Sequence, residues 1–558
     1  MIDALQATVV VLTLGVSLFL AWLIAPFLAN VFRRGPSRLD RFLDPVEKAI
    51  YRVTGVDVSR NMGWKEYFFS ALAVNLVQMA LAFAILTYQA WLPLNPRGFH
   101  GFTWDLSFTT VISFATNTNL QHYAGEQSLS IFSQMTAIQF LQFTSAATGI
   151  SMGVAFVRGL MNGSKDMGNF YVDFVRSLTR ILIPFCALAA LILVYLGVPQ
   201  TLNASTLVST IQSGTQQILV GPVASLVSIM QLGTNGGGFY GANSAYPFMN
   251  PSVPTDILEM GLMLLLPTAL VFLFGEMLGK KRETIPILVA AYGLFAIDLG
   301  IAFIPAQTLG VLQEVRFGGF LSNFWTIVTT AVTTGSVNAS LAGIHPLPIL
   351  GAFMGMLIQA TPGGKGVGLM YMVMYVVITV FIVGLMSGRT PEYLGIKITG
   401  RDVLLVMAAF LVHPLIILVP TLVAYAIGAA QSMVAATGLT GAHAATLNFI
   451  QVLYEYTTAA ANNGSDFLGT AANTVYFNVS TGIVMFLGRY APIGLLMALS
   501  GSMMGRKRTS ESGLKTDTLL FSLVLIGSII ILVVLTFFPF LALGPILSYF
   551  QGNVNGLG

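Results

Sequence analysis

Four short polar stretches interrupt a chain that is otherwise strongly apolar. One of them, residues 231–247, reads QLGTNGGGFYGANSAYP and holds three consecutive glycines. A glycine triplet is unfavourable inside a helix, because each glycine costs about 1 kcal/mol relative to alanine. Irregular backbone at membrane depth is tolerated only where it is buried in protein or lines a water-filled path. This stretch therefore predicts either a pore loop whose carbonyl oxygens replace the water shell of an ion or an ordinary turn outside the membrane.

The same pattern recurs in three other places along the chain. A mainly apolar segment of about ten residues precedes each polar stretch, and a long apolar run follows it, so that the unit repeats roughly every 100–130 residues. This recurrence favours pore loops over four unrelated turns. The other three stretches are SFATNTNLQHY (113–123), VTTGSVNAS (332–340) and TTAAANNGSDF (457–467).

The chemistry expected of these loops is the binding of a monovalent cation. They offer carbonyl, hydroxyl and amide oxygens, which suit hard cations, and a short helix ending at each loop would direct its negative end towards the ion. Ca²⁺ and Mg²⁺ usually recruit several carboxylates, whereas the loops hold only Asp466, which fits a role in solubility at the rim. The predicted filter residues are Asn117, Thr118, Asn119, Thr234, Asn235, Gly236, Gly237, Thr334, Gly335, Ser336, Asn462, Asn463 and Gly464.

The elements that must position these loops are membrane helices. Of the 558 residues, 55% are hydrophobic and 9% are charged, whereas soluble domains carry about 25% charged residues. The single cysteine excludes a disulfide framework, and basic residues dispersed in short loops argue against nucleic-acid binding. The first apolar run is long enough for a permanent helix. Spans are predicted at roughly 8–32, 66–93, 129–157, 180–198, 256–279, 286–306, 345–388 (broken by TPGGKGVG at 361–368), 403–428, 475–503 and 518–542.

We therefore expect an all-α polytopic membrane protein with a single membrane domain over residues 1–558. It would contain four pseudo-repeats of helix, pore helix, filter loop and helix, at about 66–157, 180–279, 286–388 and 403–503, plus extra helices at 8–32 and 518–542. Of the 26 basic residues, 22 lie in connections on one side, which the positive-inside rule makes cytoplasmic, so both termini face outward. Acids on or near the opposite side either form a cation-concentrating vestibule or merely keep loops soluble: Asp105, Glu126, Glu314, Glu455 and Asp466.

Two further residues are candidates for the ion path. Gln121 directly follows the first predicted filter and is either an outer ligand or a packing amide. Arg489 lies well inside the ninth span, and a charge inside the membrane is a functional hypothesis by default. Arg489 would bar the straight passage of cations, stabilise filter carbonyls, or pair structurally with a helix C-terminus or with Asp466.

The loops TNTNLQHYAGE, GTNGGGFYGANSAYPF, TTGSVNAS and AAANNGSDF, with GLMSGRTPEYLGIKI (384–398) and LTFFPFLALGPI (535–546), resemble the potassium-transporting ATPase A chain, the potassium-binding subunit of bacterial Kdp complexes. The resemblance covers essentially the whole chain. It implies a superfamily of K⁺ transporters with four pseudo-repeats, a location in the bacterial plasma (inner) membrane, and K⁺ as the transported ion. It also implies that a P-type ATPase subunit hydrolyses ATP, with a single-span accessory subunit and in some complexes a small membrane peptide as further partners.

The sequence is consistent with that division of labour. It has no GxxxxGK[ST] phosphate loop and no DKTGT phosphorylation segment, so we expect a chain that is not an enzyme on its own and binds no nucleotide. The resemblance assigns selectivity to Gln121, ion coordination to Gly237 and Gly464, and a place behind the fourth filter to Arg489. It also makes the break in the seventh span a gate loop, with Gly363, Gly364, Lys365 and Gly366.

The gate loop departs from some relatives, which carry an acid near residues 359–361 where this chain has Gln, Ala and Thr. Lys365 either points into the pore and opposes leak or reaches the cytoplasmic surface as a snorkelling lysine. Two rival functions remain: a stand-alone K⁺ channel-transporter of the same superfamily, and a secondary solute symporter with inverted repeats. Repeats that all face the same way argue against the symporter.

Overall fold

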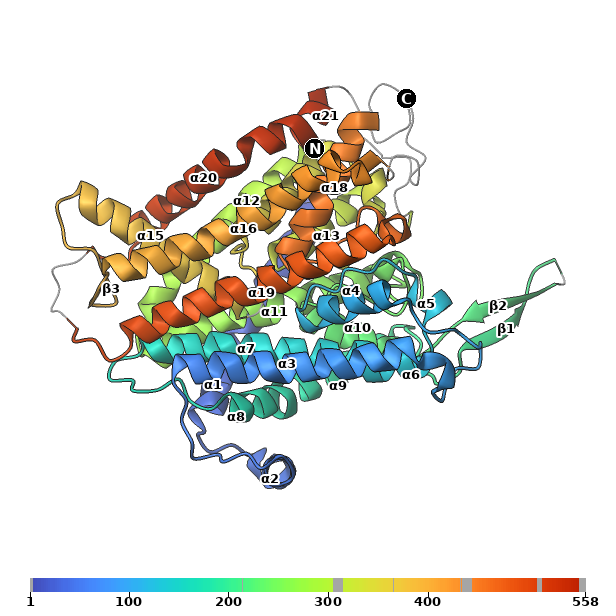
Figure 1. The fold of residues 1–558 in the computed structure, drawn as a ribbon, viewed down its shortest axis with the longest axis horizontal. Coiled ribbons are helices and arrows are strands. Elements are labelled where there is room, and N and C mark those ends of the chain that lie inside the picture. The colour runs from blue at the N-terminus through green and yellow to red at the C-terminus, as the bar shows by residue number, and fades with distance from the viewer. Residues whose placement is uncertain are drawn as a thin grey trace.

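Long helices lie side by side in a bundle in the computed structural model (Figure 1). The structure describes residues 4–212, 214–304, 315–364, 366–431, 433, 444–508 and 514–550. Within these residues, ten helical segments are long and apolar enough to cross a membrane, which confirms the predicted all-α polytopic fold. They are α1 (Ala4–Arg33), α3 (Trp64–Thr87), α6–α7 (Ile131–Leu160), α8–α9 (Phe170–Tyr195), α11 (Val253–Leu278), α12 (Thr284–Phe303), α15 (Val367–Met386), α16 (Gly400–Ala426), α19 (Val475–Met503) and α20–α21 (Leu519–Phe550).

Three of these spans contain a π-helical turn that joins two α-helices. The turns are Gln134–Gln139 between α6 (Ile131–Ser133) and α7 (Phe140–Leu160), Ser177–Leu182 between α8 (Phe170–Arg176) and α9 (Ile183–Tyr195), and Ala542–Ile546 between α20 (Leu519–Leu541) and α21 (Leu547–Phe550). The helix of the fourth span thus begins at Phe170, ahead of the predicted start at 180, because α8, which contains Asp173 and Arg176, leads into the apolar helix α9. The tenth span likewise runs to Phe550, beyond the predicted end at 542.

The predicted break in the seventh span is confirmed. The 13-residue helix α14 (Pro346–Ile358) ends where Gln359 adopts a left-handed conformation, with φ of 57°. Residues 359–364 and Gly366 are not helical, and α15 starts at Val367. The region predicted at 345–388 is therefore a half-helix followed by one full span.

Four short helices each precede a predicted filter loop. They are α4 (Trp104–Ala115), α10 (Val223–Leu232), α13 (Gly318–Ala331) and α18 (Ala444–Ala460). Most of their side chains are buried, so they lie inside the bundle, as pore helices must. The predicted order of helix, pore helix, loop and helix is therefore present four times, with α1 packed against α11 and α20 against α12 as the additional helices.

Several small elements lie outside the spans. The strands β1 (Ser205–Ser209) and β2 (Thr215–Leu219) form an antiparallel hairpin that projects from one end of the bundle (Figure 1). The strands β3 (Glu392–Tyr393) and β4 (Ile396–Lys397) form a second, tight hairpin around Leu394 and Gly395, which both have positive φ, as a type I′ turn requires. Further short helices are α2 (Asp40–Thr54) and α5 (Gly125–Ser128), and single 3₁₀ turns lie at Gln89–Trp91, Asn243–Ala245, Lys281–Glu283, Leu341–Gly343 and Gly469–Ala472.

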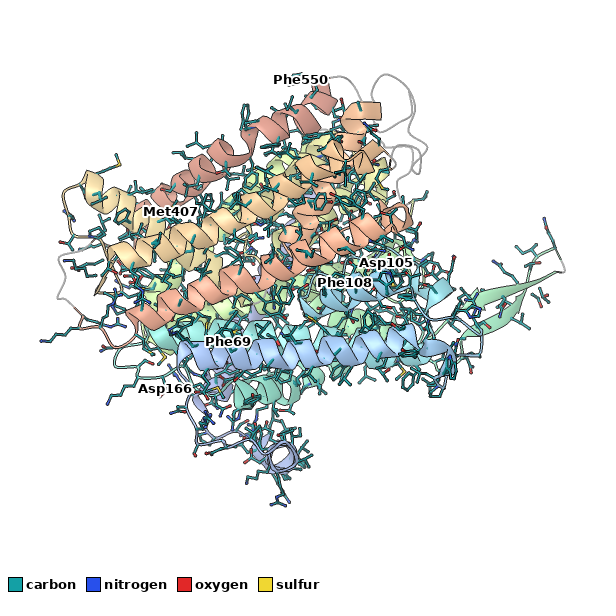
Figure 2. All side chains as sticks on the ribbon, viewed as in Figure 1. Phe69, Asp105, Phe108, Asp166, Met407 and Phe550 are labelled. Carbon is teal, nitrogen blue, oxygen red and sulfur yellow. The ribbon has the colours of Figure 1, made fainter. Side chains whose placement is uncertain are left out.

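Side chains are distributed as expected of a protein surrounded by lipid. Large apolar side chains such as Phe69 on α3 and Phe550 on α21 are exposed on the outer surface, whereas Asp166 lies in a connection between spans (Figure 2). Buried asparagine, threonine and glutamine side chains instead gather near the ends of the pore helices. The polar centre of the molecule is therefore the site where the four loops meet.

Candidate ion-binding site

The four loops share one backbone geometry. Just after each pore helix, one residue adopts positive φ, with values of 44–65°. The N–H of the next residue then donates back to the carbonyl five residues earlier, at 2.8–2.9 Å. This common closure aligns the loops, with first positions Asn117, Thr234, Thr333 and Asn462, second positions Thr118, Asn235, Thr334 and Asn463, and third positions Asn119, Gly236, Gly335 and Gly464.

The third positions bring neighbouring loops into contact. In three of the four loops this residue is glycine, and its Cα faces the backbone of the next loop so closely that a Cβ would overlap a carbonyl oxygen. Such a Cβ would lie 2.3 Å from Thr334 O at Gly236, 2.0 Å from Asn463 O at Gly335, and 1.8 Å from Thr118 O at Gly464. The first loop meets the second beside Gly237, where a Cβ would lie 2.8 Å from Asn119 O. The loops therefore form a closed ring in chain order.

The alignment shifts two of the sequence-predicted positions. The structural counterpart of Gly464 in the second loop is Gly236, and Gly237 lies one residue further along, beside Asn119. In the third loop the first position is Thr333, which sequence reasoning missed, and Ser336 lies after the third position. The physical reason is that the four loops share a backbone conformation and not a residue type. Their left-handed first residues are asparagine in two loops and threonine in the other two, so the sequence shows no common residue by which to align them.

Most polar side chains of the ring hold the loops together. The Asn462 amide donates to Thr118 Oγ1 at 2.9 Å, and the Asn463 amide donates to the carbonyl of Thr329 at 2.9 Å. The N–H groups of Gly335 and Gly464 donate to threonine hydroxyls at the ends of their pore helices, both at 2.9 Å. Because these side chains are already engaged in bracing, the backbone carbonyls become the main candidates for ion ligands.

The third span braces the ring from behind. From α7, the Gln142 amide donates to the carbonyl of Gly237 at 2.6 Å. The Ser145 hydroxyl lies 3.0 Å from the amide oxygen of Asn117 and 3.2 Å from that of Asn235. Sequence reasoning missed both residues, because their relation to the loops is one of tertiary contact.

Two buried side chains of the ring have unsatisfied polar atoms. Within the described part of the chain, neither atom of the Asn119 amide nor the Thr334 hydroxyl has a hydrogen-bond partner. Buried polar atoms without partners are costly, and an ion or ordered water at the site would satisfy them. Both residues belong to the predicted filter set.

The electrostatics of the ring favour a cation. All four pore helices end at the loops, and the C-terminal end of a helix carries a partial negative charge. A buried acid also lies behind the second loop, where the carboxyl group of Glu259 accepts hydrogen bonds from the side chains of Gln231 at 2.6 Å and Ser244 at 2.7 Å. Gln231 in turn accepts one from Ser336 at 3.0 Å. The buried acids Asp256 and Glu259 were not among the sequence candidates.

The outer acids that the structure describes brace loops. Glu455 is fully buried and lies 2.9 Å from His122 Nε2, while Asp105 is buried and accepts a hydrogen bond from Asn478 at 2.8 Å. Glu126 accepts one from the N–H of Gly241 at 2.8 Å. Glu314, which was grouped with these acids, lies outside the described residues.

Two groups of this outer cluster have perturbed pKa values. Burial raises the pKa of Asp466 to about 7, and the charge of nearby Glu455 adds to that effect. Burial alone would lower the pKa of His122. Its hydrogen bonds to Glu455 and Asn478, together with the charges of Glu455 and Asp466, outweigh burial, so the pKa of His122 is raised. Protons are therefore held in this cluster more tightly than in water.

Gln121 connects the first two loops. Its amide nitrogen donates to the carbonyl of Gly238 at 3.1 Å, and its amide oxygen accepts from the N–H of Gly238 at 3.0 Å. Both polar groups of the side chain are thus engaged by one residue of the second loop. This geometry favours the packing amide of the two alternatives left open by the sequence.

Arg489, on α19, lies next to the ring on its inner side. Together with Asn117, Thr333 and Asn462, three first positions of the loops, it lines a small cavity. The guanidinium donates to the carbonyl of Ser145 at 3.4 Å, and no carboxylate in the described ranges forms an ion pair with it. Asp466 instead accepts from backbone N–H groups of its own loop. The positive charge of Arg489 therefore faces the inner side of the ring.

The broken seventh span forms the opposite wall of this cavity. Gln359, Gly364 and Tyr371 line it, and the N–H of Gly363 donates to the last carbonyl of α13, that of Ala331, at 2.8 Å. A Cβ on Gly366 would lie 1.9 Å from the carbonyl oxygen of Gly149 on α7, so this part of the loop is in tight contact with the neighbouring span. The predicted gate loop thus packs against the inner side of the ring, while Lys365 lies outside the described residues.

A sequence profile described as KdpA, potassium-transporting ATPase A subunit, matches residues 11–550. The chain belongs to this family. It is 46% identical to the potassium-transporting ATPase potassium-binding subunit of Alicyclobacillus acidocaldarius, over 94% of this chain and 95% of that protein. It is 43% identical to the subunit of the same name from Caldanaerobacter subterraneus subsp. tengcongensis (94% and 95%) and 42% identical to that from Gloeobacter violaceus (97% and 98%).

The fold is also similar to that of a solved transporter. The crystal structure of the potassium transporter TrkH from Vibrio parahaemolyticus superposes with a TM-score of 0.52, over 89% of this chain and 98% of that chain, at 14% sequence identity. Family membership confirms the predicted resemblance of the chain to the potassium-transporting ATPase A chain. All four of the loops that carry this resemblance lie in the ring.

Proposed function

We propose that this chain is the K⁺-selecting and K⁺-translocating subunit of an ATP-driven uptake complex. The observation that carries the proposal is the closed ring of four equivalent loops at the converging C-terminal ends of four pore helices. K⁺ enters from the outer side, loses its water shell, and binds among the oxygens of the ring. Its ligands come from the predicted filter residues, chiefly their backbone carbonyls, with the Asn119 amide and the Thr334 hydroxyl as further oxygen donors.

Rigidity supports selectivity in this proposal. The direct contacts between neighbouring loops and the hydrogen bonds from Gln121 and Gln142 fix the width of the ring. A ring that cannot narrow holds a smaller ion such as Na⁺ less well, because its oxygens cannot all reach that ion. Neutral ligands also disfavour divalent cations, which usually recruit carboxylates.

The inner side of the ring supports a lateral route for the ion. A cation that moved straight on would meet the positive charge of Arg489 and the packed gate loop around Gly364 and Gly366. K⁺ therefore leaves sideways, towards a P-type ATPase subunit that supplies the energy. The relatives are named as the potassium-binding subunit of a potassium-transporting ATPase, which fits a chain that binds K⁺ and leaves hydrolysis to a partner.

The remaining parts of the proposal concern the assembly and its location. A single-span accessory subunit and, in some complexes, a small membrane peptide complete the complex. The chain lies in the bacterial inner membrane with both termini on the outer side, as the excess of basic residues in the opposite connections predicts. It binds no nucleotide itself.

The test compares K⁺ flux through the chain alone and in the assembled complex, each reconstituted into vesicles. The complex is expected to take up K⁺ only with ATP, and the chain alone is expected to pass K⁺ far more slowly than a channel. Stand-alone transport is the second candidate, because the fold is shared with TrkH. Channel-like flux through the purified chain would establish that candidate and overturn the proposed role as a pump subunit.

A further inference from the structure

The helix α2 (Asp40–Thr54) differs from every span in its direction and in its surface. It lies beside the bundle and is seen end-on in a view where the spans run across the picture, so its axis is roughly perpendicular to theirs (Figure 1). A helix perpendicular to membrane spans runs along the membrane surface. It follows α1 in the sequence and lies in the connection with the most basic residues, on the side predicted to be cytoplasmic.

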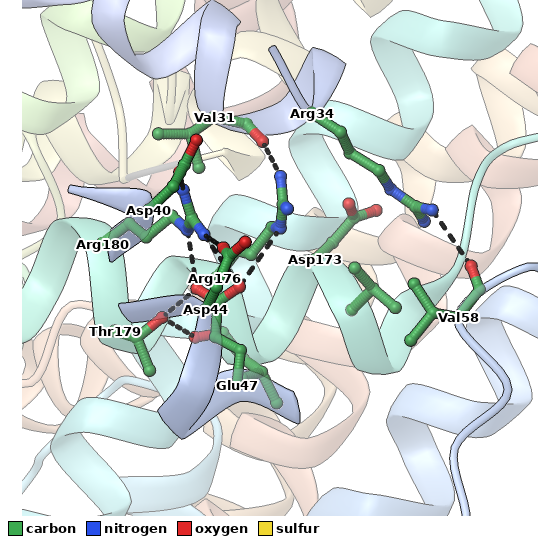
Figure 3. A network of polar contacts seen from close by, with 12 residues as sticks. Val31, Arg34, Asp40, Asp44, Glu47, Val58, Asp173, Arg176, Thr179 and Arg180 are labelled. Atoms are coloured by element: carbon green, nitrogen blue, oxygen red, sulfur yellow. Dashed lines mark hydrogen bonds and ion pairs between the residues drawn. The ribbon is translucent and has the colours of Figure 1, made fainter. Parts of the chain in front are cut away.

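An acidic stripe fixes α2 to the fourth span (Figure 3). Arg180, which is 2% exposed, donates to Glu47 through Nε at 2.6 Å and to Asp44 through Nη2 at 2.6 Å, and it also pairs with Asp40. Asp40, Asp44 and Glu47 recur at helical spacing, so one face of α2 is held against the protein. The hydrogen bond from Arg180 also lowers the pKa of Asp40, which keeps that carboxylate charged.

This attachment sets the depth of α2 in the membrane. Arg180 directly precedes the uncharged run Ile181–Tyr195, which makes up the apolar part of the fourth span. The side chain of Arg180 therefore marks the level at which that span enters the hydrocarbon region. Because α2 is bonded to Arg180, it lies at the boundary between lipid headgroups and acyl chains.

Two other stripes of α2 face away from the protein. The apolar stripe contains Phe42, Val46 and Val53, which are 70%, 50% and 86% exposed. The basic stripe contains Arg41, Lys48 and Arg52, all exposed, at the same helical spacing and next to the apolar stripe. Apolar side chains directed towards the acyl chains, with basic side chains at their flank, are the pattern of a helix that binds an anionic membrane surface.

We propose that α2 is a lipid-binding helix, which inserts Phe42, Val46 and Val53 into the cytoplasmic leaflet and holds anionic phospholipid headgroups with Arg41, Lys48 and Arg52. Charge complementarity selects this occupant, since the exposed flank of the apolar stripe is basic. The acidic stripe makes the orientation unique, because it is the face that the protein itself binds. Each basic residue near an anionic surface contributes roughly a fivefold preference, so the three together contribute roughly a hundredfold preference for anionic over neutral lipid.

Spin labels on the intact chain and on the assembled complex test this proposal. Val46→Cys and Lys48→Cys are labelled separately in a Cys186→Ala background, and their collisions with oxygen and with a water-soluble nickel complex are measured in nanodiscs. With phosphatidylglycerol present, the label at position 46 is expected to collide mainly with oxygen, as a label in lipid does. The label at position 48 is expected to collide mainly with the nickel complex. In nanodiscs of phosphatidylcholine alone, the label at position 46 is expected to become several-fold more accessible to nickel.

Charge reversal supplies the matched comparison. The triple variant Arg41→Glu, Lys48→Glu, Arg52→Glu is expected to expose the label at position 46 to nickel even with phosphatidylglycerol, whereas Arg389→Glu, Lys397→Glu, Arg401→Glu, which alters three exposed basic residues elsewhere, is expected to leave it lipid-exposed. Equal lipid exposure in all these conditions would overturn the role of the basic stripe. A label shielded from both reagents in the complex but open to nickel in the chain alone would show that a protein partner covers the helix, which also overturns the proposal.

Discussion

Adding one methyl group at Gly464 is expected to open the ring between the fourth loop and the first. Gly464 has φ of 95°, which residues with a Cβ rarely adopt, and its Cβ would lie 1.8 Å from Thr118 O. Ordinary contact begins at 3.4 Å, so Gly464→Ala requires the two loops to separate by roughly 1.6 Å. Carbonyl oxygens displaced by that distance can no longer all contact one dehydrated ion.

The magnitude follows from the strain that the loop must carry. Holding a residue in a sparsely populated backbone region costs about 1–3 kcal/mol. If K⁺ binding has to restore the closed ring, that cost appears as a loss of affinity of about 5- to 150-fold. The same strain weakens the preference for K⁺ over Na⁺, because a widened ring no longer has one fixed size.

The assay is the concentration of K⁺, and separately of Na⁺, that half-saturates the thermal stabilisation of the purified chain. Gly469→Ala is the matched control: it also adds a methyl group at positive φ, 56°, but no atom lies within 4 Å of the new Cβ. The control is expected to keep wild-type K⁺ affinity. A folded Gly464→Ala chain whose K⁺ affinity lies within about twofold of the wild-type affinity would refute the reasoning that close contact between the loops determines K⁺ binding.

Three further predictions concern residues around the ring. Gln121→Ala removes two hydrogen bonds to Gly238, each worth about 1 kcal/mol, so the K⁺ concentration for half-saturation is expected to rise about 5- to 30-fold; unchanged affinity and unchanged preference over Rb⁺ would remove Gln121 from the site. Arg489→Ala removes a positive charge from the cavity on the inner side of the ring. For an illustrative separation of about 5 Å, that charge repels a cation by about 3 kcal/mol, so K⁺ leak through the reconstituted chain is expected to rise by roughly two orders of magnitude, whereas Arg489→Lys is expected to keep the low leak of the wild type; equal leak in both variants would exclude an electrostatic barrier. Because the pKa of His122 is raised, the folded state holds its proton more tightly than the unfolded state, and this stabilisation is complete below about pH 6.5 and is lost as the pH rises through the folded pKa; His122→Gln, which keeps a hydrogen-bonding group beside Glu455 but does not titrate, is expected to flatten the melting temperature across that range, and an unaltered profile would assign the pH dependence to other groups.

Most of the fold could be predicted from the sequence, because apolar length decides which segments cross a membrane. The break after Ile358 was visible as a glycine-rich, proline-containing interruption of an apolar run. The helix of the fourth span begins earlier than predicted, because Asp173, Arg176 and Arg180 lower the hydropathy of its first turns, and their partners belong to distant segments. The hairpin of β1 and β2 gives only a short alternating pattern, which the apolar signal of the spans on either side obscures.

The candidate site was predictable in composition but not in register. Recurring Asn, Thr and Gly indicated the four loops, yet the alignment depends on left-handed first positions. Asparagine tolerates that conformation, whereas Thr234 and Thr333 do not reveal it, because β-branched residues adopt it only under tertiary constraint. The braces from Gln142 and Ser145 were also beyond sequence reasoning, since nothing in a single sequence relates them to residues far along the chain.

The ring closes where the fourth loop meets the first, between Gly464 and Thr118. These residues are separated by most of the chain, and chains are synthesised from the N-terminus. During biosynthesis, the first three loops must therefore enter the membrane before the contact that completes the ring can form. A nascent or truncated chain therefore lacks a closed ring. On the proposed function, K⁺ selectivity then arises in a single late step of assembly and not by gradual refinement of a partly open pore.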